Sequence, residues 1–336
     1  MDSPNNLSYN YEDYNDSAMT EMYSTKTALR ISLKYIYVTV YSAVMLVGVP
    51  LNLLVIVTIL CKLDRRGGAM WFLGLAITDL IFCGFLPFPI VSAWNDFNWG
   101  FGTILCKMSS YVVFMTMFNT ALMLTFMNMN HVLSKLLPCM SCSQNLCSTM
   151  LLLSWLLAAL LSIPSLLFRA VEFTVNGQVC TDNYENQYPS KITSEGLMRN
   201  KAVMYMRLIF GLLLPLAFIT ICCCLGILKR TKKEEMQYIR ISTAVTVAYF
   251  VCWVPYHAVS ALQLKSISSP DSHTHVLQML LPATNVVAAM NSCIKPIMYR
   301  FMDRSFGLQW MDNYSLIGKA EKKDSLEAAE MNEGAE

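Results

Sequence analysis

The sequence predicts an all-α membrane protein, namely a seven-transmembrane helix bundle with a short amphipathic helix after the seventh span. Its 336 residues are 55% hydrophobic and only 14% charged, with a mean hydropathy of +0.42. These values are far more apolar than those of a soluble domain of this size. Seven runs bounded by charged residues are also long enough to cross the hydrocarbon core, which takes about 20 residues. The chain therefore needs a lipid bilayer as its solvent.

Residues 1–34 are predicted to form an acidic, disordered tail outside the cell. The tail holds Asp2, Glu12, Asp13, Asp16 and Glu21 among Tyr9, Tyr11 and Tyr14, and its first basic residue is Lys26. Such a segment attracts a basic partner. It has neither a basic n-region nor an apolar h-region, so the first span is expected to direct the chain into the membrane. Asn6 and Asn15 each begin an Asn-x-Ser sequon, which is glycosylated only in the lumen.

The bundle is expected over residues 35–301. Its spans are predicted at residues 35–60, 69–93, 108–132, 146–168, 202–228, 241–264 and 276–301. Prolines inside several spans are tolerated because neighbouring helices satisfy the freed backbone groups. Residues 302–336 are predicted to form the amphipathic helix and a cytoplasmic tail.

The basic residues indicate how the bundle is oriented. They cluster after the first, fifth and seventh spans, at residues 62–66, 229–233 and 300–304. Because Lys and Arg stay on the cytoplasmic side, the N-terminus is expected outside the cell, in agreement with the two sequons. We therefore expect a multi-pass protein of the plasma membrane. The net charge of +2 forms no continuous basic stripe, so no nucleic-acid partner is expected.

The cysteines predict one extracellular disulfide at most. Of the 12 cysteines, only Cys106 and Cys180 fall in segments expected outside the cell, where thiols oxidise. Cys139, Cys142 and Cys147 have metal-like spacing on the cytoplasmic side, but no second pair follows them, so no metal site is expected. The sequence shows no nucleophile beside a base, no phosphate loop and no carboxylate pair. Neither an enzymatic activity nor a cofactor is expected.

Short motifs occur in all the predicted spans, in the order and with the spacing of one family. They are residues 48–52 (GVPLN), 75–79 (LAITD), Cys106, Trp155, Pro215, 252–255 (CWVP) and 291–299 (NSCIKPIMY). Together they resemble the rhodopsin-like (class A) G-protein-coupled receptors. Residues 99–102 (WGFG), 207–211 (RLIFG), 250–257 (FVCWVPYH) and 291–293 (NSC) are similar to the chemoattractant branch of chemerin, formyl-peptide and anaphylatoxin receptors, and most similar to the chemerin group. The resemblance implies a disulfide between Cys106 and Cys180 that holds the outer loop over a ligand pocket.

The same resemblance implies which residues bind ligand. Arg207 is a cation in the outer half of the fifth span, where a charge normally faces the bundle interior. In the chemoattractant branch a basic residue at this position meets a ligand carboxylate, which suits the bidentate guanidinium. Trp253, Tyr256 and His257 are implied to line the pocket. The alternatives are that Arg207 extends to the outer headgroups and that the other three residues fill the core.

Two family motifs are altered at the inner side of the bundle. Where the family has Asp-Arg-Tyr, whose arginine engages the G protein, this chain has Asn130, His131 and Val132. A five-donor cation is thereby replaced by an imidazole that is mostly neutral at pH 7. In the family's Asn-Pro-x-x-Tyr motif, which ends here at Tyr299, Lys295 stands in place of the asparagine. The resemblance therefore implies weakened G-protein coupling.

Lys295 has two interpretations. A lysine in the seventh span suggests a retinal-binding opsin, but the position that opsins use is held here by Ala289. Lys295 is instead expected to point toward the sodium site of related receptors. The matching residues of that site are Asp79, Thr120 and Asn291. A buried charge needs a partner, and Asp79 is the expected one.

The sequence thus predicts a cell-surface receptor for a chemoattractant-type peptide or protein, with weakened output to a heterotrimeric G protein. The acidic tail resembles the sulfated tyrosine tails with which receptors of this branch capture protein ligands. A non-signalling scavenger or decoy receptor that binds and internalises ligand is the alternative. Arrestin is left open as a partner because Ser305, Ser315 and Ser325 are few phosphate acceptors. A transporter or channel is disfavoured because no inverted repeat is found.

Overall fold

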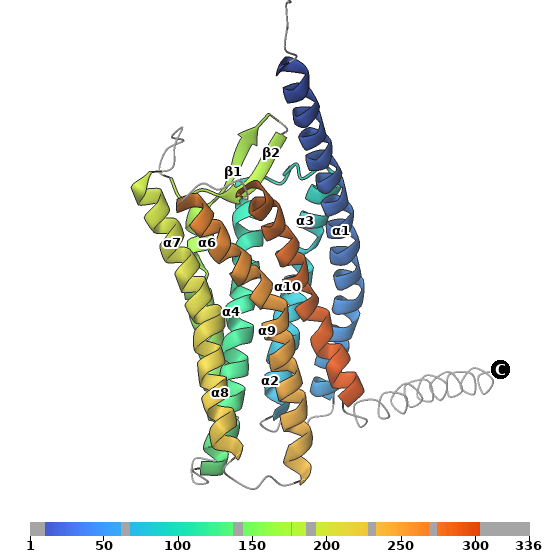
Figure 1. Cartoon of the computed structure of the whole chain (residues 1–336). Helices are drawn as coiled ribbons and strands as arrows, with labels where there is room; N and C mark the ends of the chain where they lie inside the picture. Colours follow the sequence, from blue (N-terminus) through green and yellow to red (C-terminus); the bar gives the residue numbers. More distant parts are fainter. Residues whose placement is uncertain are drawn as a thin grey trace, which may run out of the picture.

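Long helices run side by side along the whole molecule, and a small β-hairpin covers one end of them (Figure 1). The computed structural model describes residues 11–61, 68–136, 144–175, 177–185, 193–227, 233–268 and 274–302. The helices are α1 (Tyr11–Cys61), α2 (Gly68–Phe85), α3 (Pro87–Trp94), α4 (Gly102–Leu136), α5 (Gln144–Leu161), α6 (Ile163–Phe168), α7 (Ser194–Leu208), the π-helix η2 (Ile209–Leu213), α8 (Leu214–Ile227), α9 (Lys233–Ser268) and α10 (Thr274–Met302). Because α2 continues into α3, α5 into α6 and α7 through η2 into α8, these helices form a bundle of seven spans.

Six of the spans are long and apolar enough to cross a membrane by length and composition alone, within the part of the chain that the structure describes. The seventh, α10, packs against α9 and α1 and completes the bundle. It also carries buried polar residues, among them Asn291, Ser292 and Lys295. Such residues lower the hydropathy of a span, but they face the protein interior and not lipid.

Prolines mark the places where the spans bend. The chain turns at Leu86, directly before Pro87, and at Ser162, two residues before Pro164. A proline has no N–H to donate and clashes with the preceding turn, which favours an interruption at these places. Pro50, Pro255, Pro282 and Pro296 instead lie inside α1, α9 and α10, which continue through them. The π-helix lies just before Pro215, and there the buried Tyr249 hydroxyl donates a hydrogen bond to the Gly211 carbonyl at 2.7 Å. This bond fixes the middle of α9 against the fifth span.

The hairpin consists of β1 (Arg169–Thr174) and β2 (Gly177–Asp182), which pair antiparallel with Arg169 opposite Asp182. We call the end of the bundle that it covers the hairpin end. Gly177 makes the turn possible, because its φ of 117° is unfavourable for other residues. Cys180 of β2 forms a disulfide with Cys106 at the start of α4, with a Cα–Cα distance of 5.7 Å. The predicted disulfide is therefore confirmed.

The N-terminal region differs from its prediction as a disordered tail, because α1 begins at Tyr11 and projects past the hairpin (Figure 1). No Gly or Pro occurs between residues 11 and 47, so nothing interrupts the helix that the first span propagates. Lys34 Nζ lies 2.8 Å from Asp96 Oδ1, and Arg30 donates to the Asp96 carbonyl at 2.7 Å. The hydrogen bond and charge of Lys34 hold the pKa of the Asp96 carboxyl below its usual range. These contacts attach α1 to the loop after α3.

Several predictions fall on residues that the structure does not describe. Asn6 lies outside the described residues, and so does the side chain of Asn15 within α1. The amphipathic helix and tail, from residue 303 onward, lie outside them as well. Glycosylation at the two sequons and the eighth helix remain predictions from the sequence.

Candidate functional site

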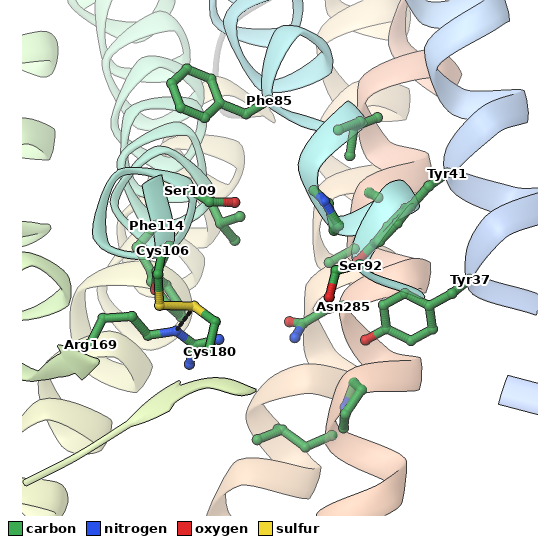
Figure 2. A pocket seen from close by; sticks show the side chains of 18 of the residues that line it. Tyr37, Tyr41, Phe85, Ser92, Cys106, Ser109, Phe114, Arg169, Cys180 and Asn285 are labelled. Atoms are coloured by element: carbon green, nitrogen blue, oxygen red, sulfur yellow. Dashed lines mark hydrogen bonds between the residues drawn. A yellow bond between two sulfur atoms is a disulfide. The ribbon is translucent and has the colours of Figure 1, made fainter. Parts of the chain in front are cut away.

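A cavity of about 410 Å³ opens beneath the hairpin, between the helices. Its volume is within the range of small-ligand pockets. Its lining residues come from the hairpin and from α1, α2, α3, α4, α7, α9 and α10. The Cys106–Cys180 disulfide lies in its wall, as Figure 2 shows. The disulfide therefore fixes the position of the hairpin over the cavity.

Arg207, near the end of α7, is buried and lines this cavity. Its guanidinium carbon lies 3.6 Å from the centre of the Phe114 ring, a cation–π contact. It also donates to the Tyr256 hydroxyl and to Ser165 Oγ, both at 3.4 Å. These partners belong to α4, α9 and α6, so the side chain is held inside the bundle. The alternative in which Arg207 extends to lipid headgroups does not fit this geometry.

Asp182, the last residue of β2, places a carboxylate between two arginines. Its Oδ1 lies 3.1 Å from Arg169 Nη1, and its Oδ2 lies 3.8 Å from Arg207 Nη1. The Tyr184 hydroxyl donates to Oδ2 at 3.5 Å. Burial alone would raise the pKa of the Asp182 carboxyl, but the charges of Arg169 and Arg207 hold it below its usual range. The carboxylate is therefore ionised, and this side of the cavity keeps one excess positive charge.

The three predicted pocket residues of α9 do not all face the cavity. Trp253 and Tyr256 line it, whereas His257 is not among its lining residues. The His257 ring lies 5.2 Å from the Tyr256 ring, and its Cε1 would be 3.5 Å from a Cβ placed on Gly211. Successive residues of a helix point about 100° apart, so His257 faces the fifth span and supports Tyr256. Its prediction as a lining residue needs this correction.

The wall opposite the arginines is uncharged and was not identified from the sequence. Tyr37 and Tyr41 of α1, Ser92 of α3 and Asn285 of α10 bring polar groups to it. Figure 2 shows these four side chains across the cavity from Arg169 and the disulfide. Tyr37 and Tyr41 lie one turn apart on α1, and their rings meet edge to face at 5.0 Å. In the sequence, this wall is indicated only by the spacing of Tyr37 and Tyr41, which places two polar hydroxyls on one face of an apolar span.

The centre of the bundle contains the expected ion pair. Lys295 Nζ on α10 lies 2.8 Å from Asp79 Oδ1 on α2, and the lysine side chain is 0% exposed. At this distance the two groups form a buried ion pair. Thr120 and Asn291, the other predicted members of the site, are buried too. Asp79 Oδ2 and Asn291 Oδ1 have no hydrogen-bond partner among the described residues.

The far end of the bundle holds the predicted coupling residues, which the structure separates. Asn130 points toward α5, where its Nδ2 lies 3.9 Å from Cys147 Sγ, and Val132 is buried. His131 and Tyr299 instead belong to one chain of rings that links four helices. Centroid distances along this chain are 5.8 Å from His131 to Tyr238, 6.0 Å from Tyr238 to Phe72 and 4.9 Å from Phe72 to Tyr299. The sequence did not point to Tyr238 or Phe72, because Tyr238 precedes the predicted sixth span and Phe72 is one of many apolar residues in the second.

Comparison with known proteins identifies the class to which this bundle belongs. A family model described as "7 transmembrane receptor (rhodopsin family)" matches residues 51–299. The chain therefore belongs to the rhodopsin family of seven-transmembrane receptors. It is a receptor and not an enzyme, as expected of a bundle whose buried polar residues line a ligand-sized cavity.

Within that family the chain falls in the chemerin-like branch. It is 35% identical to Chemerin-like receptor 1 of Bos taurus over 82% of this chain and 79% of the relative. It is 32% identical to Chemerin-like receptor 1 of Homo sapiens over 88% and 82%, respectively. It is also 32% identical to Chemerin-like receptor 2 of Mus musculus over 81% and 77%. The protein is a multi-pass, cell-surface receptor of the chemoattractant type.

Proposed function

We propose that this receptor binds a peptide or protein through the C-terminal carboxylate of that ligand, and that its coupling to G protein is weakened. The observation that supports the first part is the buried Arg207, held at the cavity wall with an excess positive charge around it. An anion that enters a water-poor cavity gains more from a guanidinium there than at the surface. A terminal carboxylate matches the fork of donors that Arg207 presents.

The orientation of the bundle in the membrane is part of the same proposal. The hairpin end faces the outside of the cell, because the Cys106–Cys180 disulfide persists in an oxidising compartment. The far end faces the cytoplasm, where the basic residues of the connections are retained. The acidic start of α1 then projects outward and attracts the basic face of a protein ligand. The relatives' names refer to chemerin, so chemerin is the first ligand to test.

Asp182 determines how much of Arg207 is available to the ligand. Its contact with Arg207 is long, 3.8 Å, whereas that with Arg169 is 3.1 Å. The carboxylate is thus held mainly by Arg169, and the contacts of Arg207 with Asp182, Tyr256 and Ser165 are all long, at 3.4–3.8 Å. An incoming carboxylate shares the guanidinium with Asp182 and is repelled by it. Asp182 therefore lowers the affinity for anionic ligands while it holds the hairpin in place.

The anchoring role of Arg207 predicts a specific loss of binding. Arg207→Ala should weaken binding of chemerin, or of a peptide matching its C-terminus, by about 2–5 kcal/mol, the usual cost of removing one partner of a buried charge pair. Amidating the peptide should produce a similar loss in the parent receptor and little further loss in the variant. Equilibrium binding at matched surface expression measures both effects.

Arg199→Ala is the matched control for that experiment. Arg199 lies two turns earlier on α7 and pairs with Glu195 at 3.2 Å, away from the cavity lining. This variant should keep both the affinity and the penalty for amidation. If amidation weakens binding to the parent and to Arg207→Ala by the same factor, Arg207 is not the carboxylate partner.

The role of Asp182 predicts a gain of binding. Asp182→Asn removes the competing charge but keeps a side chain of the same shape, so the free-acid peptide should bind about tenfold or more tightly, since like charges in a binding site are unfavourable. The amidated peptide should gain little. Equal gains for the acid and the amide would contradict competition for Arg207, because they would point to a general loosening of the hairpin.

The second part of the proposal concerns signalling to the G protein. Lys295 supplies, at Asp79, the positive charge that a sodium ion supplies in related receptors, and the ammonium is covalently tethered and does not leave. The inactive arrangement is then favoured at any sodium concentration. Independently, His131 lacks the donors of the arginine fork and packs against Tyr238 of α9. Two separate features thus oppose activation.

This account predicts that two substitutions must be combined to restore signalling. Lys295→Asn alone should make agonist binding sensitive to sodium but give little second-messenger output, because His131 is unchanged. His131→Arg alone should also give little, because the ion pair remains. The double variant should exceed the sum of the two, as expected when two sites bias one conformational equilibrium. Second-messenger output in cells at matched surface expression measures this, and strong signalling by the parent receptor would contradict the proposal.

A decoy receptor is the second candidate function. The observation that favours it is that both coupling motifs are altered, at His131 and Lys295, while the cavity keeps the arginine and aromatic lining of a binding site. Such a receptor binds and internalises ligand without signalling. Uptake of labelled chemerin with no change in second messengers, in the same cells, distinguishes this function from weak signalling.

A further inference from the structure

The hydroxyl of Tyr249, in the middle of α9, joins three spans in the interior of the bundle. Tyr249 is fully buried, and its hydroxyl donates a hydrogen bond of 2.7 Å to the Gly211 carbonyl of η2. The Met117 carbonyl of α4 lies 3.4 Å from the same oxygen. A hydroxyl has one proton to donate, so the shorter contact is the main bond and the Met117 carbonyl is a second acceptor within reach. One polar atom therefore holds α4, the fifth span and α9 together.

The sequence of the fifth span explains why the Gly211 carbonyl accepts from another helix. In a regular α-helix this carbonyl would accept from the N–H four residues later, but that residue is Pro215, which has none. The π-helix changes the spacing at this place, since the Leu214 N–H donates to the Ile209 carbonyl, five residues earlier. Single turns of π-helix often mark functional sites. The Tyr249 hydroxyl thus supplies a donor to a carbonyl whose α-helical donor is missing.

Gly211 allows the close approach that this bond needs. A Cβ at position 211 would lie 2.8 Å from Met117 Cε and 3.5 Å from His257 Cε1. A side chain there would therefore displace the methionine of α4. Because glycine has none, the backbone of η2 fits between α4 and α9 and its carbonyl comes within reach of the hydroxyl.

We propose that the Tyr249–Gly211 bond holds α9 against the fifth span in the inactive arrangement, and that it breaks when α9 turns on ligand binding. This inference rests on the second part of the proposed function and adds a third feature that opposes activation, independent of Lys295 and His131. Trp253 connects the bond to the ligand, because it lines the cavity one turn further along α9 and its ring lies 6.4 Å from the Tyr249 ring.

A bond can shift a conformational equilibrium only if it differs between the two arrangements. The carbonyl of Gly211 is fixed in the fifth span, whereas the hydroxyl is at the tip of a long side chain and moves with α9. A small turn of α9 therefore carries the hydroxyl beyond about 3.5 Å, where a hydrogen bond is lost. Inside the bundle no bulk water replaces the lost partner, so the turned arrangement leaves the hydroxyl unsatisfied. Tyr249→Phe removes that penalty and keeps the ring.

The test uses full-length, ligand-free receptor in membranes and a native thiol as the reporter. Cys252 is a buried, free cysteine three residues after Tyr249 on α9. In Tyr249→Phe, the rate at which N-ethylmaleimide labels Cys252 should rise about three- to tenfold, the range expected for one buried hydrogen bond. Cys83, a buried free cysteine of α2, should keep its parent rate. Mass spectrometry of the labelled peptides gives both rates.

Thr125→Val is the matched control. The Thr125 hydroxyl donates to the Ala121 carbonyl at 2.8 Å within α4, so its loss removes a buried bond of similar length that joins no two helices. The labelling of Cys252 should then stay at the parent rate. An unchanged Cys252 rate in Tyr249→Phe would contradict the inference. So would equal increases at Cys252 and Cys83, or an equal increase in Thr125→Val, because these results would indicate general loosening of the bundle.

Peptide binding tests whether the bond opposes the ligand-bound arrangement. A peptide that matches the C-terminus of chemerin should bind Tyr249→Phe about three- to tenfold more tightly than the parent receptor, because less energy is spent on breaking the bond. Faster labelling of Cys252 without this gain would contradict opening of the bond by ligand. If the parent does not bind the peptide at all, the ligand proposed above is wrong, and the labelling of Cys252 still decides whether the bond holds α9.

Discussion

An ammonium and a carboxylate in the middle of the bundle constrain how its helices can be arranged. Lys295 of α10 and Asp79 of α2 are removed from water and lie 2.8 Å apart. Taking either charge out of water is strongly unfavourable unless the other is in contact with it. Separation of α2 from α10 would strand both charges, so the pair fixes the two helices relative to each other. The position of α10 in turn places Asn285 at the cavity and Tyr299 at the far end.

The ion pair therefore lies between the cavity at the hairpin end and the series of aromatic rings at the far end. Toward the hairpin end, α10 contributes Asn285 and apolar residues to the uncharged part of the cavity lining. Toward the far end, Tyr299 continues through Phe72 and Tyr238 to His131, so that rings from α10, α2, α9 and α4 pack in series. On the proposed function, the cavity holds the peptide, whereas the residues at the centre and at the far end favour one arrangement of the helices. Capture of ligand and transmission of a signal are separable under that proposal.

Much of this architecture could be predicted from the sequence, because hydropathy and charge act locally. The spans followed from apolar runs, and Asp79 followed as the partner of Lys295 because a buried lysine needs a nearby acid. Other features depend on tertiary geometry. Asp182 meets the arginines only because the hairpin register places it opposite Arg169. The motif that contains His257 also does not indicate whether its ring faces the cavity or the fifth span. The start of α1 differs from the prediction because acidic composition favours disorder, whereas the absence of Gly and Pro lets the helix continue to Tyr11.

The central claim, that the Lys295–Asp79 pair holds the bundle together, is tested most directly by a double-mutant cycle. Thermal unfolding of the solubilised receptor is measured in sodium-free buffer for the parent, Asp79→Asn, Lys295→Met and the double variant. Each single change should lower the unfolding free energy by about 3–5 kcal/mol, since it leaves one buried charge unpaired. The double variant should be more stable than either single variant, because no unpaired charge remains. Additive losses in the double variant would contradict the claim.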